Sequence, residues 1–213
     1  MRQHVLRNKE RIIAENASYI AENPKELKGK WHTVFADHDA PIYLEVGSGK
    51  GQFIVGNALA YPKRCFLACE GALNVYPRIL QKAGENELSN LKLIREYIID
   101  PLEYFEYGEL AGIYLNFSDP WPKDRHAHRR LTHVSKLLSY KEIMAPGTSL
   151  EFKTDTDALF EFSLEQAELA GLKPEVVERD LHNSELSKDN IETEYEQKFS
   201  SLGKNINYMK IVF

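Results

Sequence analysis

A glycine-rich turn follows the first apolar run of the chain, with the sequence EVGSGKG at residues 45–51. Glycines let a backbone turn tightly and approach a ligand without a Cβ in the way. The spacing differs from a phosphate-binding P-loop, because a glycine follows Lys50, and from the dinucleotide fingerprint, because Gln52 stands where the third glycine belongs. The carboxylate of Glu45 would repel a pyrophosphate but suits an ammonium group. The turn therefore favours a ligand with a methionine-like end.

A second carboxylate, Glu70, ends the next apolar run. Its place matches the acid that hydrogen-bonds ribose hydroxyls in nucleotide-binding βαβ units. A tight strand-to-helix turn without any ligand would explain the glycines alone, but it does not explain two acids at successive strand ends. Together, Glu45 and Glu70 predict a ligand that carries an ammonium group at one end and a ribose at the other.

A rigid acidic loop follows a later apolar run, with the sequence NFSDPWPK at residues 116–123. Two prolines restrict its backbone, and Trp121 lies between them. A carboxylate such as Asp119, beside a rigid aromatic ring at the mouth of a sheet, suits a planar base that is bound by stacking and edge hydrogen bonds. A proline-rich loop in which Trp121 only anchors the core is the alternative that these residues leave open.

The elements that position these motifs alternate between strand and helix. We expect strands over residues 42–46, 65–69, 91–95, 113–117 and 149–153, with closing strands at 176–177 and 206–213. We expect helices after the glycine turn, over 72–84, after Pro101, over 131–144 and over 156–170. This alternation predicts βαβ units and a mostly parallel sheet, which binds ligands at the carboxyl ends of its strands.

The N-terminal part has a different pattern. Residues 1–22 form a predicted amphipathic helix and residues 23–40 a connector, so we expect a helical extension over 1–40 and one catalytic domain over 41–213. The net charge of −5 is unevenly distributed, with basic segments at the N-terminus and at residues 123–130 and an acidic segment after Glu151. A basic face can bind a polyanion despite the negative total.

The distribution of apolar residues predicts neither a secretory signal nor a membrane-spanning segment. No apolar stretch approaches the roughly 20 residues that cross a bilayer, and the N-terminus lacks the apolar region of a secretory signal. The two cysteines, Cys65 and Cys69, lie on the same face of a predicted strand rather than in a disulfide framework. We therefore expect a cytoplasmic protein without a membrane partner, and the sequence leaves open whether it forms a homodimer.

Five motifs give the chain a family resemblance. They are GKW at 29–31, EVGSGKG at 45–51, LNFSDPWP at 115–122, FKTD at 152–155 and TEYEQKF at 193–199. With these motifs in this order, nearly the whole chain resembles the bacterial tRNA (guanine-N7-)-methyltransferases. The resemblance implies a class I methyltransferase (Rossmann-like) α/β fold, with seven strands of which one is antiparallel. It also implies S-adenosylmethionine as cofactor and methylation of tRNA at guanine N7 in the variable loop, position 46.

The resemblance also implies residue roles, with Asp119 as the catalytic residue. The implied cofactor contacts are Glu45, Gly47, Gly49, Glu70, Tyr97 and Asp119. The implied contacts to the substrate nucleoside are Lys123, Asp155, Thr193, Glu194, Tyr195 and Glu196. The implied contacts to the tRNA backbone are Arg125, His126, Ala127, His128, Arg129 and Arg130. From the residues alone, Thr193 and Glu196 also fit a helix capping box, and Asp155 fits an N-cap.

The chemistry needs no metal and no nucleophilic side chain, because guanine N7 offers a free lone pair. The His126 and His128 pair lacks partners at zinc-like spacing, so we expect no metal site. The chain departs from the family pattern at Asp124, where many members have lysine, and at Tyr97, where they have an acid. Either Tyr97 stacks on the adenine or a register shift brings Glu96 there instead. A binding protein of little activity, or a methyltransferase for another RNA or a small metabolite, are the alternatives.

Overall fold

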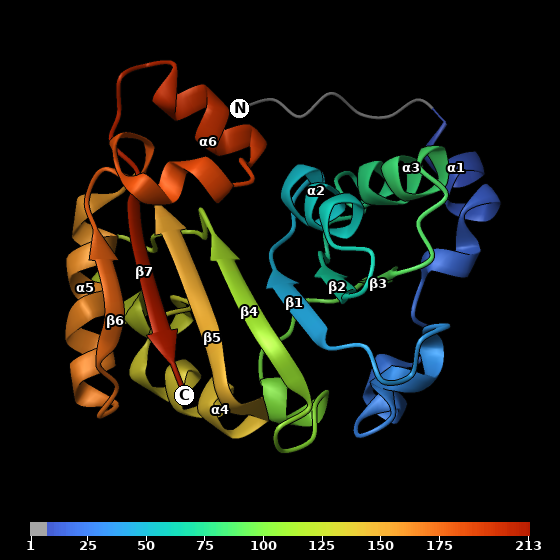
Figure 1. Ribbon diagram of the computed structural model, residues 1–213, viewed down its shortest axis with the longest axis horizontal. Coiled ribbons are helices and arrows are strands. Elements are labelled where there is room, and N and C mark those ends of the chain that lie inside the picture. Colours follow the sequence, from blue (N-terminus) through green and yellow to red (C-terminus); the bar gives the residue numbers. More distant parts are fainter. Residues whose placement is uncertain (1–7) are drawn as a thin grey trace.

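Residues 8–213, the part of the chain that this computed structural model describes, contain a seven-stranded sheet in the order β3-β2-β1-β4-β5-β7-β6 (Figure 1). The strands are β1 (Ile42–Val46), β2 (Cys65–Cys69), β3 (Leu91–Ile94), β4 (Leu110–Asn116), β5 (Met144–Thr154), β6 (Pro174–Glu178) and β7 (Asn207–Val212). Strand β7 is antiparallel to both β5 and β6, and the remaining neighbours are parallel. The predicted fold class, with one antiparallel strand among seven, is confirmed.

Helices cover both faces of this sheet. The α-helices are α1 (Lys9–Glu15), α2 (Gln52–Ala60), α3 (Pro77–Glu85), α4 (Val134–Ile143), α5 (Asp157–Leu169) and α6 (Glu194–Ser200). Helices α2 and α3 contribute to one buried cluster, and α4 and α5 contribute to the other. Helix α6 lies beyond the carboxyl ends of β4 and β5, in the long connection between β6 and β7 (Figure 1).

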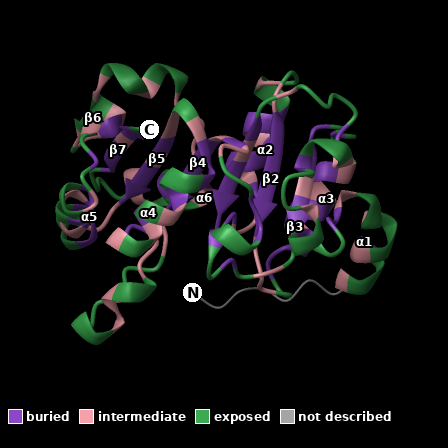
Figure 2. Ribbon diagram, turned by 90° about the horizontal axis from the view of Figure 1, so that it is seen from below, coloured by how far each residue is buried: buried purple, intermediate pink, exposed green. Residues whose placement is uncertain are grey.

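Strand β2 shows why the apolar runs form interior strands. Its five residues are all buried, and they alternate between the two clusters, with Cys65, Leu67 and Cys69 on one face and Phe66 and Ala68 on the other. A parallel strand that is covered on both faces has this nearly continuous apolar pattern. The two cysteines are free and share a face, as the spacing predicts. In Figure 2, the central strands are largely buried while α1 is largely exposed.

The N-terminal helix is shorter than the expected span of 1–22, of which residues 1–7 lie outside the described part. Helix α1 ends at Glu15, because the backbone of Asn16 leaves the helical region with a φ of −119° while its side-chain amide donates to the Ile12 carbonyl. A short 3₁₀ turn (Ala17–Tyr19) follows, and Ile20 then pairs with Leu93 of β3 in a parallel bridge. The expectation of helix beyond residue 19 is wrong, since the chain there extends the sheet edge.

The connector at residues 23–40 is anchored by Trp31. Its side chain is fully buried, its indole N–H donates to the Tyr104 carbonyl at 2.8 Å, and its ring stacks on Phe105. The carboxylate of Glu109 accepts hydrogen bonds from the backbone N–H groups of Gly29 and Trp31. The GKW motif therefore fixes the connector to the sheet core.

The starts of α4 and β5 differ from the expected ones. Helix α4 begins only at Val134, because His133 takes the N-cap position and accepts from the Ser135 N–H. Strand β5 begins at Met144, where a helix end was expected, and its pairing to β4 is interrupted by an irregularity before Ser149. The early start of β5 was hidden because a bulge breaks the apolar alternation.

Candidate active site

The glycine turn connects the carboxyl end of β1 to α2. Gly47, Gly49 and Gly51 all have positive φ angles, of 79°, 55° and 80°. A Cβ on Gly51 would lie 2.9 Å from the Ile79 side chain, so close helix packing requires this glycine. A Cβ on Gly47 or Gly49 would meet nothing within 4 Å. These two glycines therefore border open space at the end of the sheet, where a ligand can approach the backbone.

Glu45 is the buried acid of the site. Its side chain is 1% exposed, and Oε1 accepts a hydrogen bond from the Asn116 amide at 2.8 Å. Oε2 is buried and has no hydrogen-bond partner among the described residues. Burial raises the pKa of Glu45 to about 7, although the hydrogen bonds and the charge of Lys153 act in the opposite direction. An orphaned buried oxygen of this kind is costly unless a ligand satisfies it.

Glu70 follows β2 and closes the glycine turn. Its carboxylate accepts hydrogen bonds from the backbone N–H groups of Gly49 at 3.1 Å and Ala72 at 2.9 Å. Burial raises the pKa of Glu70, and the negative charge of Asp119 adds to the rise. The carboxylates of Glu70 and Asp119 therefore lie close enough to repel each other across the site.

The loop after β4 carries Asp119, whose carboxylate is exposed at the sheet edge. Strand β4 ends at Asn116 because Phe117 adopts a φ of 50°. Trp121, on the other side of Asp119, has a φ of 40°. Non-glycine residues in the left-handed region are strained, and such strain is concentrated at functional sites. Trp121 is only partly buried, so the alternative in which it anchors the core is wrong.

The basic segment after this loop forms a 3₁₀ helix (Asp124–Arg129). Arg125 and His128 are exposed, while the guanidinium of Arg129 lies 4.9 Å from the centre of the Trp121 ring. His126 packs edge-on against the same ring. Arg130 turns back to the loop, where it donates to two backbone carbonyls. The segment thus divides into outward-facing groups and groups that contact the loop.

The TEYE motif starts α6 and has both expected features of a capping box. The Thr193 hydroxyl accepts from the Glu196 N–H at 2.9 Å, and the Glu196 carboxylate accepts from the Thr193 N–H at 3.2 Å. Glu196 is fully buried and pairs with Lys153 at 3.2 Å. Tyr195 is 47% exposed, and its ring makes stacked contacts with Phe117 and with Phe199, at centroid distances of 6.5 and 6.2 Å.

The remaining residues of the predicted substrate set lie around this edge. The carboxylate of Asp155 contacts the Lys204 ammonium at 2.8 Å, and Glu194 pairs with Lys82 of α3 at 3.0 Å. Lys123 is exposed at the start of the basic segment. The N-cap interpretation of Asp155 is wrong, because α5 begins one residue later with Thr156 at its N-cap.

Comparison with known proteins identifies the relatives of this chain. Residues 39–209 match the family described as "Putative methyltransferase". The tRNA (guanine-N(7)-)-methyltransferase of Latilactobacillus sakei subsp. sakei (strain 23K) is 48% identical over 195 residues, 92% of this chain and 91% of the relative. The protein of the same description from Bacillus subtilis (strain 168) is 47% identical over the same shares. The chain belongs to the tRNA (guanine-N(7)-)-methyltransferase family.

Solved structures support the fold of this family member. The 16S rRNA methyltransferase KamB superposes with a TM-score of 0.60 at 15% identity, covering 81% of this chain and 87% of that one. The 16S rRNA (adenine(1408)-N(1))-methyltransferase from Catenulisporales acidiphilia gives a TM-score of 0.57 at 15% identity, covering 90% and 94%. At such low identity the likeness concerns the class I methyltransferase fold alone.

The cofactor of this methyltransferase is S-adenosylmethionine, and the residues at the site fit it. The orphaned Oε2 of Glu45 is a partner for the ammonium group of the cofactor. The open space beside Gly47 and Gly49 accommodates a chain that passes close to the backbone. Glu70 keeps acceptor capacity on both oxygens beyond its backbone hydrogen bonds, which suits ribose hydroxyls.

Tyr97 lies beside the predicted cofactor site in this family member. Its ring is 68% exposed and covers Gly71, where an added Cβ would lie 2.6 Å from the ring. The Glu96 carboxylate instead accepts a hydrogen bond from the Tyr104 hydroxyl at 2.6 Å. Directly after Tyr97, the side chain of Ile98 is buried and holds the chain against the core, whereas Ile99 is 77% exposed.

Two polar residues of the site, Asn116 and Lys153, lie within the motifs, but the sequence does not predict their roles. Asn116 holds Glu45, and Lys153 is buried between Glu196, Asn190 and the Phe53 ring. The position of Lys153 near the end of an apolar strand is a signal in the sequence, because a lysine that is buried there needs a negatively charged partner. Their partners come from distant parts of the chain, which the motif pattern does not show.

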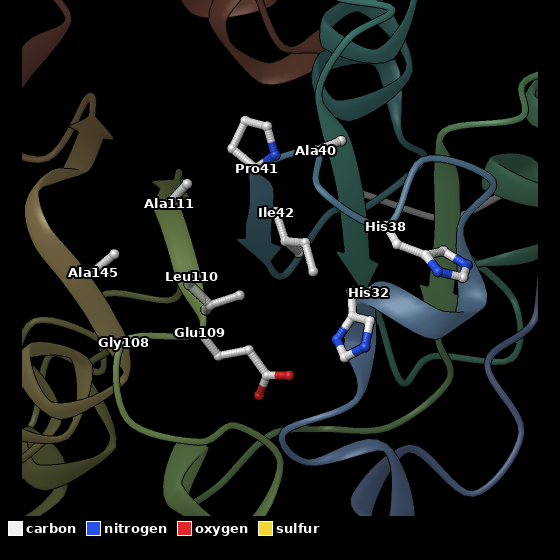
Figure 3. A pocket seen from close by; sticks show the side chains of 10 residues that line it. All are labelled: His32, His38, Ala40, Pro41, Ile42, Gly108, Glu109, Leu110, Ala111 and Ala145. Carbon is white, nitrogen blue, oxygen red and sulfur yellow. The ribbon is translucent and has the colours of Figure 1, made fainter.

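A cavity of about 330 Å³ lies at the opposite end of the strands, beside the amino ends of β1 and β4. Figure 3 shows the side chains of His32, His38 and Glu109 around it, with apolar residues of the strand starts. Among residues 8–213, no group of three or more histidine, cysteine or acidic side chains is placed to hold a metal ion. No helix in the same range is long and apolar enough to cross a membrane.

Proposed function

We propose that the chain transfers a methyl group from S-adenosylmethionine to N7 of a guanine in tRNA, at position 46 of the variable loop. The observation that carries this proposal is that a possible cofactor site and a possible base site lie at the same end of the sheet. The orphaned carboxylate oxygen of Glu45 and the strained acidic loop with Asp119 both lie at the carboxyl ends of the central strands. The relatives described as tRNA (guanine-N(7)-)-methyltransferases support tRNA as the substrate, and we therefore place the reaction in the cytoplasm.

On the cofactor side, each residue has a proposed partner. Glu45 binds the ammonium group, while Gly47 and Gly49 let the methionine portion lie against the turn. Glu70 binds the ribose hydroxyls, and Tyr97 stacks on the adenine. When bound, S-adenosylmethionine supplies a methyl group on a positively charged sulfur, which is already electrophilic. The protein therefore has to align the methyl group rather than activate it.

On the substrate side, Asp119 is the proposed catalytic residue. Guanine N7 has a free lone pair, so no side chain must remove a proton before the attack. Asp119 accepts hydrogen bonds from guanine N1 and N2, which orients the base and favours the positive charge that develops on it. Tyr195 offers an exposed ring to the nucleoside, and Lys123 and Asp155 border the same edge. The target guanine must leave its stack to reach this place.

The basic segment and the capped helix complete the proposed RNA surface. Arg125, His128 and Arg129 present their side chains to solvent and are placed to contact phosphates. Thr193 and Glu196 serve the substrate site indirectly, because their capping box positions the first turn of α6. Glu194 lies on that same turn.

Nucleoside analysis tests the proposed reaction. We expect purified protein, incubated with labelled cofactor and unmodified tRNA, to form 7-methylguanosine at position 46, mapped by cleavage and mass spectrometry. Asp119→Ala should lower the rate by about a hundredfold and leave cofactor binding intact, because an oriented electrostatic group is lost. Asp124→Ala removes a nearby exposed acid and serves as the matched control. A methyl group on another atom, or on no tRNA, would overturn the proposal.

Salt dependence tests the RNA surface separately. Replacing Arg125 and Arg129 by alanine should reduce the slope of log affinity against log salt by about 1 to 2 units, since each phosphate contact releases counterions. Filter binding of tRNA between low and moderate salt measures this slope. An unaltered slope would place the RNA on another face.

A further inference from the structure

The loop that carries Asp119 is strained on both sides. Phe117 and Trp121 have φ angles of 50° and 40°, although neither is a glycine. A side chain in the left-handed region persists only where the surrounding structure imposes it. Phe117 is fixed by its N–H, which donates to the Lys153 carbonyl at 2.9 Å. A corresponding restraint is needed on the side of Trp121.

Arg130 provides that restraint. Its Nε donates to the Pro120 carbonyl at 3.0 Å, and its Nη2 donates to the Trp121 carbonyl at 3.0 Å. Its guanidinium lies 4.2 Å from the centre of the Phe162 ring on α5. One planar fork thus holds two consecutive carbonyls directly after Asp119 and is itself supported by a helix of the core. A lysine ammonium, as a point donor, does not reproduce this planar geometry.

The rest of the basic segment is arranged differently. Arg125 is exposed, and Arg129 approaches the Trp121 ring without a hydrogen bond to the loop backbone. Arg130 already directs donors on one edge of its guanidinium to the protein, so fewer remain for a phosphate. The resemblance places Arg130 among the RNA contacts, but its hydrogen bonds point to a different role.

We propose that Arg130 is a positioning residue, which holds the Pro120–Trp121 backbone so that the Asp119 carboxylate faces the substrate base. This inference rests on the proposed function, because it takes Asp119 as the catalytic residue. It predicts that Arg130 acts on the rate of methyl transfer, whereas Arg125 acts on tRNA affinity. A misplacement of a reacting group by about 1 Å can cost about a hundredfold in rate.

Arg130→Lys is the decisive variant, because it keeps the positive charge but loses the fork. We expect kcat at saturating tRNA and cofactor to fall by about tenfold or more, while tRNA affinity and its salt slope stay at wild-type values. Arg179→Lys is the matched control. That arginine also lies over a phenylalanine of α5, Phe160, and pairs with Glu161, but it contacts no backbone carbonyl of the loop. Retained kcat in Arg130→Lys would overturn the proposal, as would reduced tRNA affinity with a flatter salt slope in Arg130→Ala.

A fluorescence measurement tests the restraint without any substrate. The chain has two tryptophans, and Trp31 is fully buried, so acrylamide quenching reports on Trp121. We expect quenching to increase in Arg130→Lys and to stay unchanged in Arg179→Lys, with equal melting temperatures as the check on folding. Unchanged quenching in Arg130→Lys would refute the restraint. If instead quenching increases but the wild-type protein methylates no tRNA, the proposed function fails and the restraint stands.

Discussion

Cofactor affinity should depend steeply on pH, because Glu45 is buried with an unsatisfied oxygen. Its pKa is raised by burial to about 7, and pairing with an ammonium group requires the ionised form. For a pKa near 7, about half of the free protein carries the carboxylate at pH 7, but only about 3% does at pH 5.5. The affinity for the cofactor should therefore fall about 16-fold when the pH is lowered from 7 to 5.5, which corresponds to about 1.6 kcal/mol of binding free energy.

Titration calorimetry with S-adenosylhomocysteine measures this effect, since the compound has the same amino-acid end. Between pH 5.5 and 7 its ammonium stays mostly charged, because α-amino groups have pKa values of about 7.7–8.0. Paired titrations in buffers of different ionisation enthalpy also count protons. We expect the release of about half a proton at pH 7 and nearly one proton at pH 5.5.

Two variants separate Glu45 from its neighbour. Glu45→Gln should bind weakly with little dependence on pH, because it cannot ionise. Glu70→Gln should bind more weakly than wild type but keep most of the slope, since Glu70 faces neutral hydroxyls in the proposed site. Constant affinity from pH 5.5 to 7 in the wild-type protein, without proton release, would refute the assignment of Glu45 to the ammonium group.

The same raised pKa affects the stability of the free protein in the opposite sense. The folded state binds the Glu45 proton more tightly than the unfolded state, in which the pKa of Glu45 has its ordinary value of 4.5. The tighter binding of this proton adds about 3 kcal/mol to the free energy of unfolding. The added stability is fully present below pH 4.5 and is lost as the pH rises through about 7. Denaturant titration should show a smaller decline with pH for Glu45→Gln.

The remaining predictions concern Tyr97 and the buried ion pair. Tyr97→Ala should weaken cofactor binding several-fold, because ring stacking contributes about 1 kcal/mol, while Glu96→Ala should change it little. The opposite ranking in calorimetry would establish the shifted register. Lys153→Met should lower the free energy of unfolding by about 3–5 kcal/mol, since it leaves the buried Glu196 carboxylate without its lysine counter-charge. A loss below 1 kcal/mol in denaturant titration would contradict this role of the ion pair.

The sequence predicts the central strands of the sheet well, because they are apolar runs with both faces buried. It also predicts that Glu45, Glu70 and Asp119 lie at the same end of the sheet, since each stands at or just after the carboxyl end of a parallel strand. It does not predict where the N-terminal helix stops, because that depends on one side chain, Asn16, which bonds back to the Ile12 carbonyl. Such local competition between side chain and backbone has no signature in the apolar pattern.

Residue roles were harder to predict than residue positions, because partners come from distant segments. Glu196 belongs to a motif that implies a substrate contact, yet its carboxylate is fully buried and accepts from Lys153, His182 and Asn190. The capping box was predictable, since both of its partners lie within four residues. The ion pair was not, because it joins residues that are 43 positions apart.

This ion pair also connects α6 to the cofactor site. Strand register places Asn116 of β4 beside Lys153 of β5, and Asn116 holds Glu45 of β1. The positive charge of Lys153 lowers the pKa of Glu45, and Glu196 of α6 neutralises part of that charge. Lys153 therefore links the segment that borders the substrate site to the acid that is proposed to bind the cofactor.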